Sequence, residues 1–315
     1  MGWRIVVDGS FDLGATMRSG QVFRWDAVPS AGGSVCWRGV VEGALLQLRA
    51  PAVTPRSTSA RVEVELIAGE YTRTSAGRLL RCDDPYRTWC RDLMVDRLTR
   101  DAVSAAPGMR LLRQAPWDAT VAFICSSANN QLRMRRMLDA LANRLGEPLL
   151  DGDGRVCGSA LPSAQRLAKS TEGDLRRLGL GYRARTLHQS ACRLADEGLS
   201  HFLGPCSDLP LAEARERLCE LPGVGPKVAD CIALFSLDQL EAFPLDVWMV
   251  RVLEHGYPLR GPRTYRRLQR WVQRHLPSPR GYLQQFLYHH GRLLGRAGLA
   301  ALRQHPPPRA GAWPP

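Results

Sequence analysis

The hydrophobic pattern of the chain changes its period once, and this change limits the folds open to it. Before about residue 70, apolar and polar residues alternate, as in RVEVELI at 61–67, and a Glu42-Gly43 turn separates two further alternating runs. Such alternation is typical of strands with one buried face. From about residue 85, apolar residues recur at the i, i+3, i+4 spacing of helices. We therefore predict an α+β fold, with a small N-terminal antiparallel sheet packed on a mostly helical body.

The same pattern predicts three segments. Residues 1–100 should form the sheet domain with a flanking helix, 101–304 the helical body, and 305–315, rich in proline, a loose tail. DGDGRVCGSALP at 151–162 and HFLGPCSDLP at 201–210 have the composition of loops. We expect no return of strand structure after residue 85.

Charge and cysteine content point to a class of partner and a compartment. With 43 Lys plus Arg against 30 Asp plus Glu, the net charge is +13, which favours a polyanionic partner, nucleic acid first. A basic surface kept only for solubility remains the alternative. The nine cysteines include no C-x-x-C pair, so they predict neither a zinc site nor a disulfide framework but a reduced, intracellular protein. No secretory leader and no membrane span is expected.

One short turn between two amphipathic stretches predicts a helix-hairpin-helix at 211–236. The turn is PGVG within LPGVGPKVADC at 221–231. Glycines there can take positive φ, which lets two helices pack closely and points backbone N–H groups outward. Gly223, Gly225 and Val228 are the expected backbone contacts to a DNA phosphate.

A lysine in this hairpin stands out because Lys169 and Lys227 are the only two lysines in the chain. Pro226 suits the first position of a helix, which places Lys227 in the first turn. We expect the helix dipole and partial burial to lower the pKa of that amine and make it a nucleophile, which an arginine cannot become. A plain phosphate contact by Lys227 is the alternative.

An aspartate follows 19 residues after this lysine. Asp246, in FPLDVWMV, precedes a predicted helix and suits its N-cap. A carboxylate beside a reacting amine can also shuttle protons or stabilise a cationic sugar, and the two roles are compatible. Lys227 and Asp246 are therefore the predicted catalytic pair.

These motifs resemble those of the 8-oxoguanine DNA glycosylases, within the helix-hairpin-helix, Gly-Pro-Asp superfamily of base-excision enzymes. LPGVGPKVADC with PLDV is joined by SGQVFRW at 19–25, RLLRQAPWDATVAFICSSANN at 110–130 and LRRLGLGYRAR at 175–185, in the family's order. The resemblance implies a bifunctional DNA glycosylase and apurinic-site lyase. Such an enzyme flips a damaged guanine from duplex DNA, attacks C1′ with the lysine and cleaves the strand by β-elimination.

The resemblance also implies where and with what the protein works. It predicts duplex DNA containing a damaged purine as partner, no cofactor, no metal, no membrane and a monomer. The expected location is intracellular and DNA-associated, in the cytoplasm or nucleoid of a prokaryote and otherwise in the nucleus.

The family's binding residues carry over to two sets of positions. The flipped base should contact a glycine carbonyl, a stacking pair and an amide, namely Gly20, Cys231 with Tyr288, and Gln284. A second set should contact the gap that the flipped base leaves in the duplex and the cytosine opposite it. These residues are Asn129, Arg133, Tyr182 and Arg183. Core packing is the alternative for Cys231 and Tyr288, and a solvated basic face for the arginines.

Three positions depart from the family pattern. Ala128 stands where the first asparagine of a run of three is usual, which puts strict reading of the opposite base in doubt. Trp248 replaces a histidine two residues after the catalytic aspartate, and Tyr288 replaces a phenylalanine. The tryptophan puts the local phosphate or pocket contact in doubt but leaves the predicted lysine chemistry intact.

Two other functions remain open from the sequence. A glycosylase for alkylated bases would need the hairpin and the aspartate but no lysine nucleophile, and an adenine-excising relative would need four cysteines near the C-terminus, whereas none follows Cys231. A non-catalytic hairpin module would need none of Lys227, Asp246 and Gly20. Covalent trapping by borohydride on DNA with 8-oxoguanine separates these possibilities.

Overall fold

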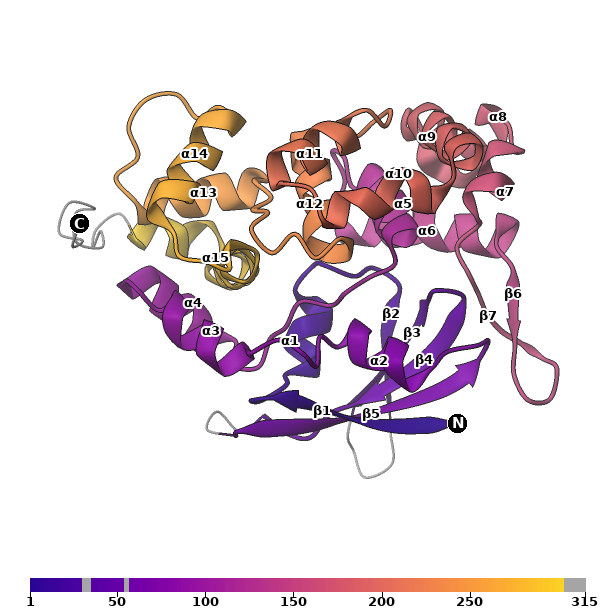
Figure 1. Cartoon of the computed structure of the whole chain (residues 1–315), viewed down its shortest axis with the longest axis horizontal. Coiled ribbons are helices and arrows are strands. Elements are labelled where there is room, and N and C mark those ends of the chain that lie inside the picture. The colour runs from indigo at the N-terminus through magenta and orange to yellow at the C-terminus, as the bar shows by residue number, and fades with distance from the viewer. Residues whose placement is uncertain (30–34, 54–56, 303–315) are drawn as a thin grey trace.

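A five-stranded antiparallel sheet forms one end of the molecule and helices form the rest (Figure 1). The computed structural model describes residues 1–29, 35–53 and 57–302. The strand order is β1–β5–β4–β3–β2. The strands are Gly2–Asp8 (β1), Trp25–Pro29 (β2), Val35–Val41 (β3), Ala44–Arg49 (β4) and Ser59–Ala68 (β5). The predicted α+β class is confirmed.

The sheet has one dry and one wet face, as its alternating sequence requires. Val62 and Val64 are buried and lie opposite Ile5 and Trp3 of β1, whereas Glu63 between them is exposed. The predicted turn between β3 and β4 is also confirmed, because Glu42 and Gly43 both have positive φ, as a two-residue hairpin turn demands.

Two helices cover the dry face and separate the sheet from the helical body (Figure 1). They are α1 (Leu13–Arg18) and α2 (Arg73–Leu79). Leu13, Met17 and Leu79 share a core with the strands. Both helices begin before residue 85, where helical structure was expected to start. The sequence did not predict them because each is too short to show a clear helical period.

The helical body packs around one large core. Its N-terminal part contains α3 (Tyr86–Leu93), α4 (Arg97–Ala105), α5 (Pro116–Cys125), α6 (Gln131–Leu145), α7 (Ala164–Ala168), α8 (Glu172–Leu175) and α9 (Arg183–Glu197). Its C-terminal part contains α10 (Leu199–Leu203), α11 (Leu211–Cys219), α12 (Pro226–Ser236), α13 (Val247–Gly256), α14 (Tyr265–His275) and α15 (Arg280–Leu302). Within the described ranges, no helix is both long and apolar enough to cross a membrane.

The predicted helix-hairpin-helix is confirmed as α11 and α12. Gly223 has φ +82°, and a Cβ there would lie 2.7 Å from the Cβ of Thr186 on α9, so the turn requires glycine. The Ser190 hydroxyl of α9 donates to the Pro222 carbonyl at 2.8 Å. Pro226 is the first residue of α12, as expected. The hairpin is therefore held against α9, with the start of α12 fixed in place.

Two segments predicted to be loops contain regular structure. Pro148–Leu150 (β6) and Val156–Ser159 (β7) form a hairpin, so the expectation of no further strands is wrong. These strands are too short for a period, and Leu149 packs on Leu45 of the main sheet. Likewise, 201–210 contains the end of α10 and a 3₁₀ turn, Gly204–Ser207.

Two helical stretches that read as continuous in sequence are interrupted. The first breaks at residues 126–130, between α5 and α6, where Ala128 takes φ +47°. The second breaks after the irregular turn Arg176–Leu180, where Gly179 and Gly181 have positive φ. Both interruptions lie close to the cavity described below.

The proposed boundary at residue 100 stays a prediction. Tyr86, Leu93 and Leu98 pack in the core of the helical body, while Leu112 packs in the core of the sheet. The chain thus crosses between the two cores more than once. The proline-rich tail at 305–315 lies outside the described residues.

Candidate active site

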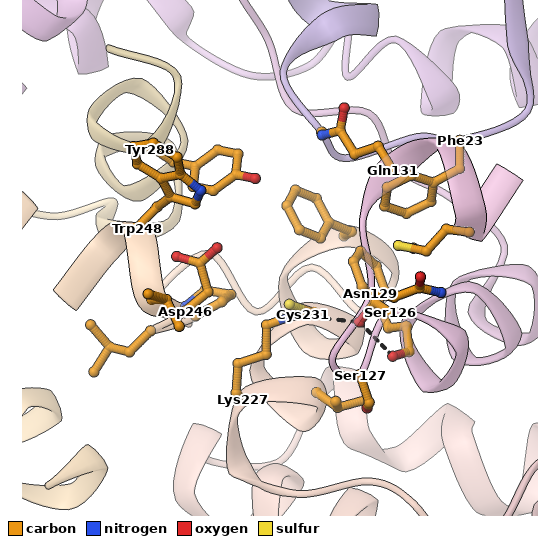
Figure 2. A pocket seen from close by; sticks show the side chains of 18 of the residues that line it. Phe23, Ser126, Ser127, Asn129, Gln131, Lys227, Cys231, Asp246, Trp248 and Tyr288 are labelled. Atoms are coloured by element: carbon orange, nitrogen blue, oxygen red, sulfur yellow. Dashed lines mark hydrogen bonds between the residues drawn. The ribbon is translucent and has the colours of Figure 1, made fainter. Parts of the chain in front are cut away.

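A cavity of about 500 Å³ lies where the hairpin helix α12 meets α13, α15 and the loop before α6. Gly20, from the turn between α1 and β2, closes one side. Figure 2 shows Trp248, Tyr288 and Asp246 on one side of the cavity, Asn129, Gln131 and Phe23 on the other, and Lys227 and Cys231 between them. The cavity therefore brings together residues that lie far apart in sequence.

Most of the predicted site residues line this cavity. They are Gly20, Asn129, Lys227, Val228, Cys231, Asp246, Gln284 and Tyr288. The remaining predicted residues lie outside its lining, in the hairpin turn and around the opposite-base gap. The predicted catalytic pair and all four predicted base contacts thus share one space.

Lys227 reaches the cavity from the first turn of α12. Its Nζ lies 3.5 Å from the Ser126 hydroxyl and 5.9 Å from the centre of the Phe123 ring. Both partners belong to the end of α5 and the loop that follows it. The amine thus reaches from α12 toward α5, with weak polar contacts to the Ser126 hydroxyl and the Cys231 thiol that a substrate can replace.

Asp246 is the N-cap of α13, as the sequence predicts. Its carboxylate accepts a hydrogen bond from the Met249 N–H at 2.8 Å, while the residue remains half-buried at the cavity. Burial raises its pKa above the ordinary value, although this hydrogen bond and Lys227 oppose the shift. The carboxylate therefore caps a helix and lines the same cavity as the amine.

The prediction that the helix N-terminus lowers the pKa of Lys227 is wrong. The pKa is raised, by negative charge on Cys231 first and then on Asp246, and these effects outweigh burial. Burial also raises the pKa of the Cys231 thiol to about 11, so at neutral pH that thiol is protonated. Asp246 is then the remaining negative group that favours the protonated form of the amine. The free protein keeps its lysine protonated, and the amine must lose that proton before it can attack.

Gly20 cannot be replaced by a larger residue in this conformation. Its φ is +87°, and a Cβ would lie 2.7 Å from the Gln131 amide nitrogen and 3.2 Å from the Tyr288 ring. The backbone of the turn therefore approaches the cavity as closely as the chain allows. This proximity is what a backbone contact to a bound base needs.

Gln284 presents an unsatisfied acceptor. Its side-chain nitrogen donates to the Pro244 carbonyl at 3.2 Å, which fixes the amide orientation because that carbonyl can only accept. The Oε1 atom is buried and has no partner among the described residues. Leaving such an acceptor unpaired costs about 1–3 kcal/mol, so this atom favours a bound group that donates hydrogen bonds.

The predicted opposite-base residues are occupied by contacts with the protein itself. The Tyr182 hydroxyl and Arg183 Nε donate to the Ser127 carbonyl at 3.0 and 2.9 Å, and Arg183 also binds the Ala128 carbonyl. The Asn129 amide donates to the Cys125 carbonyl at 3.0 Å. Arg183 is buried, so it holds the loop in the free protein. Its contact with an opposite base stays a prediction that requires these bonds to change.

Arg133 and the hairpin turn are open to solvent. Arg133 is exposed in the first turn of α6. Gly223 and Gly225 are exposed as well, and no side chain caps the start of α12, so its first backbone N–H groups are available to a phosphate.

Sequence reasoning missed an aromatic wall and a second cation. Phe123 stacks on Phe235 with ring centres 5.4 Å apart, and Phe23 meets Phe123 edge-on at 5.9 Å. Arg292, one turn after Tyr288 on α15, places its guanidinium 5.7 Å from the centre of the Tyr288 ring. The i, i+4 spacing from Tyr288 was the signal available for Arg292.

Nothing in the described part of the chain groups three or more histidine, cysteine, aspartate or glutamate residues into a possible metal site. The cavity instead offers one amine, one carboxylate, four side-chain amides and aromatic rings. Such a set suits a planar, polar base and the sugar attached to it.

Comparison with known proteins agrees with this geometry. The family described as 8-oxoguanine DNA glycosylase, N-terminal domain, matches residues 4–120. An N-glycosylase/DNA lyase of Saccharomyces cerevisiae is 32% identical over 190 residues, which are 58% of this chain and 50% of the yeast protein. The N-glycosylase/DNA lyase OGG1 of Arabidopsis thaliana is 44% identical over 147 residues, 45% of this chain and 40% of the plant protein. The matched region thus spans half or less of these curated relatives.

A solved structure extends the likeness to nearly the whole fold. The apo-form 8-oxoguanine glycosylase/lyase of Clostridium acetobutylicum superposes with a TM-score of 0.77 at 25% identity, over 89% of this chain and 92% of that one. The chain is therefore similar to 8-oxoguanine DNA glycosylases, in sequence over residues 4–120 and in fold over most of its length. The resemblance drawn from its hairpin and aspartate motifs is confirmed.

The positions at which this chain departs from the 8-oxoguanine DNA glycosylase pattern lie around the cavity rather than at the lysine. Ala128 takes a left-handed backbone conformation in the loop held by Arg183. Trp248 lines the cavity and packs under Arg251, whose guanidinium lies 5.6 Å from the centre of the indole. Lys227 and Asp246 keep the sequence spacing of the family motif and line the same cavity.

Proposed function

We propose that this protein is a bifunctional DNA glycosylase and apurinic-site lyase that excises 8-oxoguanine from duplex DNA. One observation carries the proposal: the Lys227 amine enters a cavity shared with the Asp246 carboxylate, next to a hairpin with free backbone donors. The names of the yeast, plant and clostridial relatives support both activities. Such an enzyme acts wherever chromosomal DNA lies, the nucleoid of a prokaryote or a nucleus.

The reaction begins when the damaged nucleotide leaves the stack and enters the cavity. The proton of Lys227 moves to Asp246 or to the departing base, and the freed amine attacks C1′. A C–N bond to the lysine forms as the bond to the base breaks, and the base leaves with the bonding electron pair. Opening of the sugar gives a Schiff base, and loss of a C2′ proton then expels the 3′ phosphate by β-elimination.

Three groups are placed to select the base. The backbone at Gly20 can accept the N7 hydrogen that 8-oxoguanine has and guanine lacks, and the unpaired Gln284 oxygen can accept from the pairing edge. Tyr288 and Cys231 line the same cavity and can contact the two faces of the base. A wrong base leaves a buried acceptor without its donor.

Covalent trapping tests the nucleophile. Wild type, Lys227→Gln and Lys169→Gln are incubated with borohydride and a duplex containing 8-oxoguanine opposite cytosine. Reduction of the Schiff base should link wild type and Lys169→Gln to the DNA, while Lys227→Gln should give no adduct. Lys169 is the matched control, since it is the only other lysine. A persistent adduct in Lys227→Gln, or no excision by wild type, contradicts the proposal.

A further inference from the structure

The positive charge of the chain is concentrated near its C-terminus. Residues 255–315 contain 11 arginines and no aspartate or glutamate. Residues 1–254 hold the other 32 basic residues and all 30 acidic ones, which leaves a charge of only +2 there. A basic surface kept for general solubility would not be confined in this way, so this region calls for a specific polyanion.

Helix α14 displays this charge as a single stripe. The stripe consists of the exposed residues Arg266, Arg267, Arg270 and Arg274. At 3.6 residues per turn these four fall within an arc of about 100°. The arc is opposite the buried Leu268 and Val272, which pack in the main core. The stripe therefore faces away from the protein.

The guanidinium groups of the stripe have no polar partner among the described residues, whereas the nearest arginine on each side of α14 has one. Arg263 pairs with Glu254 at 3.0 Å, and Arg280 pairs with Glu241. None of the four stripe side chains makes a hydrogen bond or an ion pair with a described residue. Unpaired, solvated guanidinium groups are free to neutralise external phosphates.

A buried network fixes the stripe to the hairpin. Asp230 of α12 is fully buried and accepts hydrogen bonds from Arg215 of α11 at 2.7 Å and from Gln269 of α14 at 2.9 Å. Tyr265, at the start of α14, donates to the same carboxylate and lies 3.3 Å from the Pro226 carbonyl. The first stripe arginine thus directly follows a residue that touches the start of α12.

We propose that the α14 stripe is a second phosphate-binding element, which continues along the DNA strand held by the hairpin. The inference rests on the proposed function for its duplex partner. From Arg266 to Arg274 the helix rises about 12 Å, at 1.5 Å per residue. One strand of a duplex presents a phosphate about every 3.4 Å along the axis, so the stripe spans about three phosphates. It therefore adds affinity without reading sequence.

The salt dependence of binding tests this proposal. One variant carries Arg→Gln at 266, 267, 270 and 274. The matched control carries Arg→Gln at 49, 61, 73 and 100, which are exposed arginines without ion pairs on the sheet and on α2 and α4. Affinity for an undamaged duplex is measured from low to moderate salt. Each lost phosphate contact lowers the slope of log K against log salt by about 0.9, so the stripe variant should lose about 2 to 3. The control should lose less than 1.

The outcomes separate this inference from the proposed function. Single-turnover excision by the stripe variant at saturating protein should stay within about twofold of wild type, because the stripe lies outside the cavity. If both variants keep the wild-type slope while wild type excises 8-oxoguanine, the stripe does not bind DNA and the glycosylase proposal stands. If the salt-dependence slope is smaller for the stripe variant although wild type excises no 8-oxoguanine, the stripe proposal is supported and the glycosylase proposal is contradicted. A loss seen only with RNA, or only with an acidic protein, overturns the stripe proposal. Thermal melting checks that both variants remain folded.

Discussion

The lysine side of the cavity and the opposite-base side differ in how far the free protein has prepared them. Lys227 and Asp246 line a common space, and the amine makes only weak polar contacts, to Ser126 and Cys231. On the other side, Arg183, Tyr182 and Asn129 donate hydrogen bonds to backbone carbonyls at the end of α5 and in the loop that follows it. The bond-breaking groups are ready before DNA arrives, whereas the base-reading groups must first exchange protein partners for a base.

Bond breaking and recognition of the opposite base therefore differ in the free energy that each requires, although both occur at one cavity. A hydrogen bond from a charged group contributes about 1.5–3 kcal/mol, so releasing Arg183 from two carbonyls consumes much of what a base contact returns. Ala128 offers the gap no polar side chain to offset that loss. We therefore expect the rate of excision to depend strongly on Lys227 and Asp246 and only mildly on the identity of the opposite base.

Lys227→Arg gives the largest expected effect. Arginine keeps a cation in the first turn of α12 but cannot lose its proton at neutral pH, so it cannot form the Schiff base. We expect excision to fall by at least about 10³-fold while duplex affinity changes by less than about threefold. Single-turnover gel assays and a binding titration measure the two quantities. Appreciable excision by this variant would show that the prepared side of the cavity is not where the chemistry occurs.

Asp246→Asn should have the next largest effect. Asparagine is an equally good N-cap, so stability should be unchanged, while loss of the carboxylate should slow excision by about 10²–10⁴-fold. Burial raises the pKa of Asp246, so the wild-type rate should fall on acidification through a raised value, and the variant should lack this acid limb. Asp246 also helps raise the pKa of Lys227, so the rise of the residual rate with pH should begin at lower pH in the variant. A variant whose excision rate is lower at every pH but has the same pH dependence as wild type would contradict this role of the Asp246 carboxylate.

Ala128→Asn addresses the other side and should have the smallest effect. Asparagine tolerates the left-handed backbone found here and adds an amide to the gap. The preference for excision opposite cytosine over adenine should grow by about tenfold, since one or two new hydrogen bonds contribute about 1 kcal/mol each. Ala128→Gly is the matched control, because it relieves the backbone without adding an amide. Equal preferences in the two variants would show that the amide does not read the base.

The sequence predicted most where a local motif carries its own geometry. Pro226 at the start of a helix, Asp246 as an N-cap and the Glu42-Gly43 turn need only nearby backbone, and all three were found as expected. Features set by distant contacts were missed. The β6–β7 hairpin depends on Leu149 packing against Leu45, and the pKa of Lys227 depends on Asp246 from another helix.

Breaks within helical patterns formed a second kind of error. Residues 126–130 keep a helical spacing of apolar side chains on both sides, so their period alone gives no sign of an interruption. The loop exists because Arg183 and Tyr182, more than fifty residues away, bind its carbonyls. Single-sequence patterns cannot reveal partners at that separation.

The orientation of the Gln284 amide links base binding to the stability of the whole fold. Its buried oxygen has no partner among the described residues. A bound base that donates a hydrogen bond to this oxygen removes the free-energy cost of leaving it unpaired. Part of the affinity for such a base therefore comes from this hydrogen bond rather than from buried contact area. A lesion that seats its hydrogen-bond donors there should make the whole enzyme harder to melt, whereas a base of the same size without them should leave its melting temperature nearly where it was.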